Sequence, residues 1–305
     1  MRHTPGMNGH STLTRIAAVA AAGATVLAVA ACGSSTTGAS SGSQAVPVVA
    51  SINQWGSVAH DLGGSNVNVT SIMSNTKVEA HDYEPTSQDV MQFTKAKVVV
   101  VNGAGYDSWA SKAAQSTSAT VVDAARAAGK KTGDNPHVWF SAAVRNDVAD
   151  AITRAYTKAD PSHKAEYTQL NRKWHAREQA LEKRIAAASV RTAHVRYAAT
   201  ESVAWYLAHD LKMSDATPRG YAQASANESE PTPGDITSFQ KALARGDIAM
   251  LVFNSQEADS VTDQITGSAT SNGVPIVSLT EQMPQKYDDL LAWMGALVTE
   301  FSKAA

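Results

Sequence analysis

Two histidines and two glutamates of this chain have sequence contexts in which they could bind a metal ion. His81 lies in VEAHDYEP, His137 in NPHVWF, Glu201 in AATESV and Glu281 in SLTEQMP. Each follows, or lies near the end of, an apolar run and precedes a helical pattern, which is where α/β sheets bind ligands. We therefore expect the fold to bring these four side chains together around one divalent metal ion.

The donor types restrict the choice of metal. Imidazole and carboxylate together suit Zn, Mn or Fe, whereas the chain has a single cysteine and so cannot build a thiolate site. Other interpretations stay open for each residue. His137 could be a surface or capping residue, and Glu201 and Glu281 could be first-turn helix residues placed for the helix dipole.

The first 45 residues are expected to lie outside the fold. Arg2 and Arg15 precede an apolar run, 16–31, that is short for a membrane span and ends in VAAC at Cys32. This pattern indicates a secretory signal peptide over residues 1–32, and its ending resembles a bacterial lipoprotein signal, in which the cysteine is lipidated. The alternative is a plain signal peptide with a chance cysteine. Residues 33–45, mostly Ser, Thr and Gly, are expected to form a flexible tether.

Length and charge limit the possible functions of the remainder. About 260 residues are enough for two domains of ordinary size. The formal net charge is −2, and there is no tract rich in Lys and Arg, which argues against nucleic acid as a partner.

Apolar runs alternate with helical patterns along both halves of the chain, which predicts α/β lobes with parallel sheets. The polar stretch 210–235 is expected to be a long loop with a helix cap near its end. The segment Asn102–Tyr106, NGAGY, is expected to be a tight strand-to-helix turn rather than a phosphate loop. The boundaries predicted from this pattern are an N-terminal lobe over 46–159, a connecting helix over 160–194 and a C-terminal lobe over 195–305. The predicted strands are 46–51, 67–73, 98–101, 121–123, 195–200, 248–253 and 274–279. The predicted helices are 55–63, 86–96, 141–158, 161–188, 236–245, 261–271 and 290–301.

Three motifs carry a resemblance to a known family. AHDYEPT, NPHVWF and the stretch from Asp160 to Asn171, of the pattern DPxxxxxYxxLN, are similar to signatures of the zinc- and manganese-binding solute-binding lipoproteins of ABC metal importers. The resemblance runs from about Val48 to the C-terminus. It implies two Rossmann-like lobes joined by one long rigid helix, with one Zn or Mn ion between them and little hinge motion.

The chain departs from the family pattern at two positions. The third ligand of zinc-type relatives is usually histidine, and the matching residue here is Glu201, as in manganese-type relatives. At the fourth position relatives typically have aspartate, whereas this chain aligns Glu281, whose longer side chain must fold back to reach the same point.

The resemblance implies a function outside the cytoplasm. The protein would be a monomer, attached through lipid on Cys32 to the outer face of the plasma membrane, that captures Zn or Mn and delivers it to an ABC permease. It would not be an enzyme. The alternatives are a secreted zinc metallohydrolase, although the sequence contains no HExxH pattern, and an adhesion lipoprotein.

Overall fold

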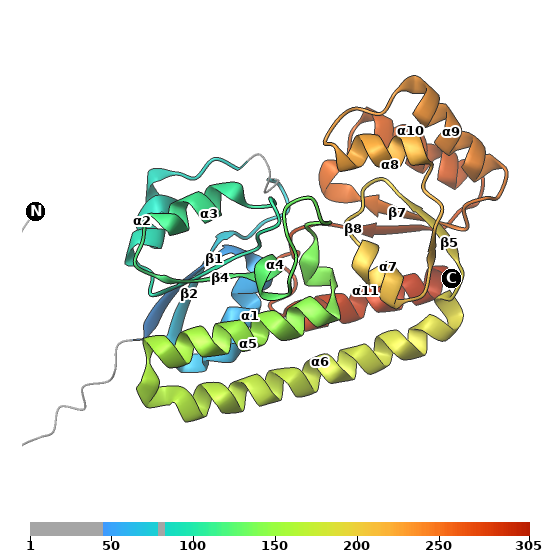
Figure 1. Ribbon diagram of the computed structural model, residues 1–305. Coiled ribbons are helices and arrows are strands. Elements are labelled where there is room, and N and C mark those ends of the chain that lie inside the picture. The colour runs from blue at the N-terminus through green and yellow to red at the C-terminus, as the bar shows by residue number, and fades with distance from the viewer. Residues whose placement is uncertain (1–44, 79–82) are drawn as a thin grey trace, which may run out of the picture. The chain divides into compact units, whose positions relative to one another are not determined.

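Two parallel β-sheets and the helices that cover them make up the fold (Figure 1). The computed structural model describes residues 45–78 and 83–305, all within one compact unit. The expected class, α/β with two parallel-sheet lobes joined by a long helix, is confirmed. Among the described helices, none combines the length and the apolar character needed to cross a membrane.

The first sheet has four parallel strands in the order β2-β1-β3-β4. Its central strand β3 consists of four fully buried valines. Val98 and Val100 belong to one apolar cluster, and Val99 and Val101 to another, as expected for a strand whose side chains alternate between two covered faces. The strands are β1 (Val46–Ile52), β2 (Val67–Met73), β3 (Val98–Val101) and β4 (Thr120–Asp123).

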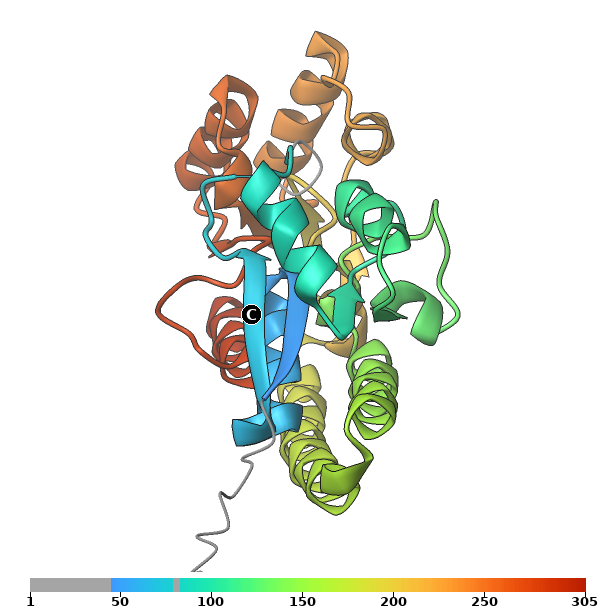
Figure 2. The same ribbon diagram turned by 90° about the vertical axis from the view of Figure 1, so that its left-hand side faces the viewer.

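Helices cover both faces of this sheet. On one side of the strands lie α2 (Ser87–Lys95) and α3 (Ser108–Gln115), which pack against each other (Figure 2). On the other side lie α1 (Asn53–Gly63) and α5 (Ala142–Ala159), next to the short helix α4 (Ala124–Ala127). Of the two residues that could cap this helix, Thr86 and Ser87, Thr86 does so; its hydroxyl accepts from the Asp89 N–H in a capping box.

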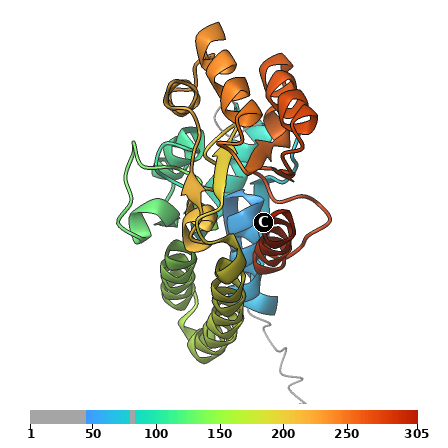
Figure 3. The ribbon, with the colours of Figure 1, turned by 90° about the vertical axis from the view of Figure 1, so that its right-hand side faces the viewer.

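The second sheet repeats the strand order of the first. Its strands are β5 (Arg196–Ala199), β6 (Ser214–Asp215), β7 (Met250–Asn254) and β8 (Ile276–Leu279), arranged β6-β5-β7-β8 and all parallel. On one side lie α8 (Arg219–Ala226), α9 (Pro233–Ala244) and α10 (Ser260–Ser271), as Figure 3 shows. On the other side lie α7 (Trp205–Asp210) and α11 (Leu290–Ala304).

The prediction of one long loop over 210–235 is wrong, because this stretch contains β6 and α8, but the helix cap expected near its end is confirmed at Thr232. Helix α8 has a polar sequence, and Tyr221 is its only buried residue. That ring packs edge-on against Phe239 of α9, with ring centroids 4.8 Å apart. Tyr221 thereby packs α8 into the second apolar cluster, and one buried ring leaves no periodic apolar pattern in the sequence.

The connecting helix α6 (Lys164–Thr192) has 29 residues and is about 43 Å long at 1.5 Å per residue. It packs against α1 and α5 of the first lobe and against α11 (Figure 1). An ion pair with no solvent exposure joins α5 to α6. Arg145 donates to both carboxylate oxygens of Glu178, at 3.0 and 2.6 Å, and to the carbonyl of Trp139 at 2.9 Å.

The segment that follows β8 is attached to the first lobe by hydrogen bonds. The Gln54 amide donates to the carbonyl of Glu281 at 2.6 Å. The Asn53 side chain donates to the Met283 carbonyl at 2.6 Å and accepts from the Met283 N–H at 3.2 Å. The turn that carries Glu281 is thus fixed by helix α1, although it belongs in sequence to the second lobe.

Replacing Glu178 by Gln should lower the free energy of unfolding by about 3 kcal/mol, because the buried guanidinium of Arg145 loses its counter-charge. Urea unfolding of the metal-free protein measures this change. The control is Glu300→Gln, which removes the exposed partner of Lys303 and should cost less than about 1 kcal/mol. Equal losses in the two variants would contradict the argument.

Candidate metal centre

Three of the four predicted ligands converge at the carboxyl ends of the strands. Glu201 follows β5, Glu281 follows β8, and His137 immediately precedes a 3₁₀ turn that leads into α5. Neither glutamate is in a helix: Glu201 lies in a bend before α7, and Glu281 lies in the loop before α11. The alternative that they are first-turn helix residues is therefore wrong.

The donor atoms are close enough to bind one ion. His137 Nε2 lies 3.3 Å from Glu201 Oε1 and 3.7 Å from Glu281 Oε2. One donor atom from each residue lies within 4.8 Å of the others. Ligands with bonds of about 2.1 Å in a tetrahedral site are about 3.4 Å apart. The side chains of His137, Glu201 and Glu281 could therefore hold an ion with small adjustments.

The imidazole of His137 is held in a fixed orientation. It is 2% exposed, and its Nδ1 lies 3.0 Å from Asn135 Oδ1, which also accepts from the His137 N–H at 2.9 Å. In the neutral ring Nδ1 then carries the proton, which leaves the lone pair on Nε2. Within residues 45–78 and 83–305, no contact of Nε2 has the geometry of a full hydrogen bond, and Glu201 Oε1 lies nearby at 3.3 Å. A buried ring nitrogen whose lone pair is available in the neutral imidazole is suited to bind a metal ion.

Two residues that the sequence did not indicate hold the carboxylates. The Asn254 amide donates to Glu201 Oε2 at 2.6 Å and to Glu281 Oε1 at 3.1 Å. The Tyr106 hydroxyl donates to Glu281 Oε2 at 2.7 Å. Asn254 ends a buried strand of the second lobe, and a polar residue at that position is the one signal that could have identified it.

Tyr106 is positioned by the glycine-rich turn after β3, which is a tight strand-to-helix turn as predicted. The Asp107 carboxylate accepts from the N–H groups of Asn102 and Gly103, at 2.6 and 2.9 Å. Gly103 has φ of 76°, and a Cβ there would lie 2.2 Å from Asp123 Oδ1. The glycines of this motif therefore serve the turn that directs Tyr106 into the site.

The two carboxylates control protonation in the site. Burial by itself would lower the pKa of His137, but its contacts with Glu201 and Glu281 and their negative charges outweigh burial and raise the pKa to about 9. Burial, and then the charge of Glu281, raises the pKa of Tyr106 well above its usual range. The phenol therefore remains protonated and donates to Glu281 at neutral pH.

An open, acidic cavity of about 580 Å³ leads to the site. His137 and Glu201 line it, together with the carboxylates of Glu230, Glu257 and Asp259. A wall of this charge would attract cations and repel anions.

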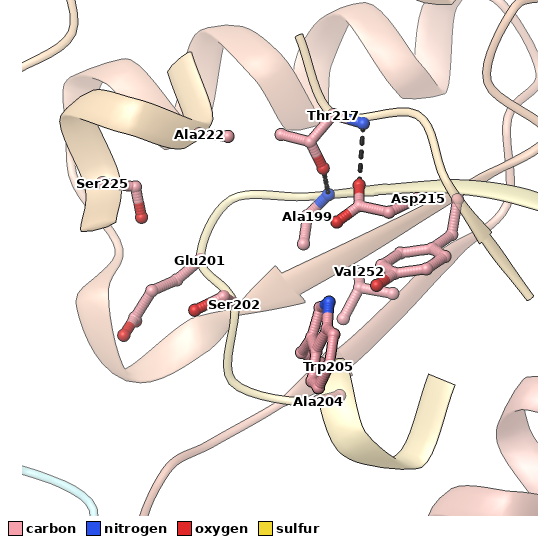
Figure 4. A pocket seen from close by; sticks show the side chains of 11 residues that line it. Ala199, Glu201, Ser202, Ala204, Trp205, Asp215, Thr217, Ala222, Ser225 and Val252 are labelled. Carbon is pink, nitrogen blue, oxygen red and sulfur yellow. Dashed lines mark hydrogen bonds between the residues drawn. The ribbon is translucent and has the colours of Figure 1, made fainter. Parts of the chain in front are cut away.

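A smaller pocket of about 40 Å³ lies behind Glu201, between β5 and α8 (Figure 4). Its inner polar groups are paired with one another. Thr217 Oγ1 accepts from the Ala199 N–H at 3.0 Å, and Asp215 accepts from the Thr217 N–H at 2.9 Å. The carboxylate of Glu201 points away from both (Figure 4). This pocket therefore supports the turn that carries Glu201 and offers no separate donor set.

Two predicted site residues lie outside the described part of the chain. His81, the expected fourth ligand, and Cys32, the expected lipidation site, are not among the described residues. The same holds for the expected signal peptide over 1–32 and for nearly all of the tether. These assignments, and the assignment of the other three residues as ligands, stay predictions.

Comparison with known proteins gives a consistent family. A family model described as "Zinc-uptake complex component A periplasmic" matches residues 48–304. The chain is 27% identical over 223 residues to a putative metal-binding protein of Treponema pallidum. This alignment covers 66% of this chain and 70% of that protein. It is 31% identical over 142 residues to the manganese-binding lipoprotein MntA of Bacillus subtilis. This alignment covers 43% of this chain and 46% of MntA.

A solved structure shares the fold. The solute-binding protein FpvC of Pseudomonas aeruginosa, solved in complex with Mn²⁺, superposes with a TM-score of 0.71 at 20% sequence identity. The alignment covers 86% of this chain and 98% of FpvC. At this identity the similarity establishes the arrangement of the two lobes and not the ligands.

In the metal-free protein, His137 should titrate near pH 9, because the carboxylates of Glu201 and Glu281 stabilise its charged form. NMR of the imidazole resonances measures this midpoint directly. In Glu201→Gln the midpoint should fall, since one of the two negative charges is gone. A midpoint below the usual 6.5 in the unsubstituted protein would show that burial outweighs the carboxylates.

Proposed function

Because the chain belongs to the family described as zinc-uptake complex component A, periplasmic, we propose that it captures a divalent transition metal, Zn²⁺ or Mn²⁺, outside the cytoplasm and delivers it to an ABC permease. In this proposal the metal is cargo, and the ligands are His137, Glu201 and Glu281 together with His81. The protein is a binding protein and not an enzyme.

One observation carries this proposal: a buried imidazole nitrogen and oxygens from two carboxylates lie within 4.8 Å of one another. These side chains come from both lobes and are far apart in sequence. Two carboxylates close together in a buried site repel each other, so an arrangement that keeps them together favours a cation. The donor set, nitrogen and oxygen without sulfur, suits Zn or Mn.

His81 completes the donor set in this proposal. It lies in AHDYEPT, one of the stretches that resemble the family signatures. With it the ion has two imidazoles and two carboxylates, which is enough for a closed site. A hydrolase would need an open position for water with a base beside it. The closed set therefore favours transport over metallohydrolase chemistry, and no described feature favours adhesion.

The location follows from the family and from the start of the chain. The description of the matching family names a periplasmic protein, and the Bacillus subtilis relative is described as a lipoprotein. The VAAC sequence that ends at Cys32 fits the same arrangement. These features support our proposal that the protein is a monomer held by lipid on Cys32 at the outer face of the plasma membrane, where a permease can take up the ion.

Protein purified without chelators should contain one equivalent of Zn or Mn, measured by elemental analysis. The variants His137→Ala and Glu281→Gln should lose affinity by about 100-fold or more, since loss of a residue that merely orients a ligand already costs 10- to 100-fold. His60→Ala, which changes an imidazole that is largely exposed, is the matched control and should bind as the unsubstituted protein does. Unchanged affinity in both site variants would refute the proposed site.

Metal affinity should rise with pH through the neutral range. His137 carries a proton below about pH 9 in the metal-free protein, and the ion must displace it. The apparent affinity should therefore increase by about tenfold per pH unit below that value. Calorimetry in buffers with different ionisation enthalpies should detect release of a proton on binding. Binding that releases no proton and is independent of pH would count against His137 as a ligand.

A further inference from the structure

Asn254 contacts both proposed carboxylate ligands with a single amide group. We propose that Asn254 is a positioning residue that sets the metal preference of the site by holding one oxygen of each carboxylate, so that each offers a single oxygen to the ion. The inference rests on the proposed function and concerns the choice between the two cargo metals.

The position of Asn254 follows from the order of the second sheet. It is the last residue of β7, and β7 lies between β5, which leads to Glu201, and β8, which leads to Glu281. Its side chain is buried, and Nδ2 donates to Glu201 Oε2 at 2.6 Å and to Glu281 Oε1 at 3.1 Å. An amide nitrogen has two hydrogens, which is one for each carboxylate.

The amide of Asn254 is itself fixed. Its Oδ1 accepts from the Gln256 N–H at 3.1 Å, and its backbone N–H donates to Thr200 Oγ1 at 3.0 Å. If the side-chain amide were flipped, its nitrogen would face the N–H of Gln256 and its oxygen would face two carboxylates. The hydrogen bonds therefore permit one orientation, with the two donors directed at Glu201 and Glu281.

The remaining oxygens face His137, and Glu281 Oε2 also accepts from the Tyr106 hydroxyl at 2.7 Å, which leaves one lone pair of that oxygen for the ion. Glu201 Oε1 and Glu281 Oε2 lie 3.3 and 3.7 Å from His137 Nε2. Neighbouring ligands are about 3.4 Å apart in a tetrahedral site with bonds of about 2.1 Å, and about 3.0 Å apart in an octahedral one with the same bonds. Both distances from His137 Nε2 are therefore closer to the tetrahedral value than to the octahedral one.

This arrangement favours zinc. Zn²⁺ in closed protein sites is almost always four-coordinate, whereas Mn²⁺ prefers octahedral sites that are rich in oxygen. A carboxylate that binds through both oxygens raises the coordination number. The hydrogen bonds from Asn254 oppose that mode in both carboxylates, and so they discriminate against Mn²⁺ beyond the general preference of nitrogen and oxygen sites for Zn²⁺.

The test compares Zn²⁺ and Mn²⁺ binding to the full-length protein and to Asn254→Ser. Serine lacks the amide donors, yet its short hydroxyl can still accept from the Gln256 N–H and keep the turn. Zinc affinity should fall by about 10- to 100-fold, as for other residues that orient metal ligands. Manganese affinity should fall much less, so that the ratio of the Mn²⁺ to the Zn²⁺ dissociation constant drops about tenfold. X-ray absorption of the Mn²⁺-loaded variant should detect additional oxygen neighbours.

Ser255→Ala is the matched control. It removes a hydrogen bond of the same turn, from Ser255 to the Leu279 carbonyl, and touches neither carboxylate. In Ser255→Ala, the ratio of the Mn²⁺ to the Zn²⁺ dissociation constant should equal that of the unsubstituted protein. The second substitution at the amide, Asn254→Ala, should reproduce the effect of Asn254→Ser. Equal changes in both dissociation constants, or an unchanged coordination number, would overturn this inference and leave the proposed function standing. An unsubstituted protein that binds neither metal would overturn the proposed function as well.

Discussion

The structure of the site depends on keeping two carboxylates together in a buried environment against their mutual repulsion. Glu281 is fully buried and Glu201 is largely buried, so water screens their charges poorly. Hydrogen bonds from Asn254 and Tyr106 offset part of the repulsion. In the metal-free protein the proton on His137 supplies positive charge, and the bound ion would replace that proton.

The fold supplies this arrangement from both halves of the chain. Parallel strands place their carboxyl ends at one edge of a sheet, so the turns after β5, β7 and β8 all reach the same region. The first sheet has the same strand order and contributes Tyr106 from the turn after β3. Neither half contains the whole site, because Glu281 takes its hydroxyl donor from one lobe and its amide donor from the other.

Contacts outside the site hold the two halves in position. Gln54 and Asn53 of α1 bind the backbone around Glu281 and Met283. Arg177 of α6 forms ion pairs with Asp61 of α1 and with Asp289, the residue that caps α11. A hinge motion that opened the site would have to break these contacts. They therefore favour the limited motion that the family resemblance implies.

The local features of the fold could be predicted from the amino-acid sequence. Apolar runs and their periods predicted the parallel strands and the long helix, because these patterns depend on neighbouring residues. The positions of Glu201 and Glu281 after such runs, and of His137 directly before one, identified them as candidates, and His81 stays a prediction. The partners that hold these side chains could not be predicted, because they come from segments far apart in the sequence. Asn254 and Tyr106 act through strand order and turn geometry, and the one buried ring of α8 packs among residues of other elements, so no local sequence pattern predicts these contacts.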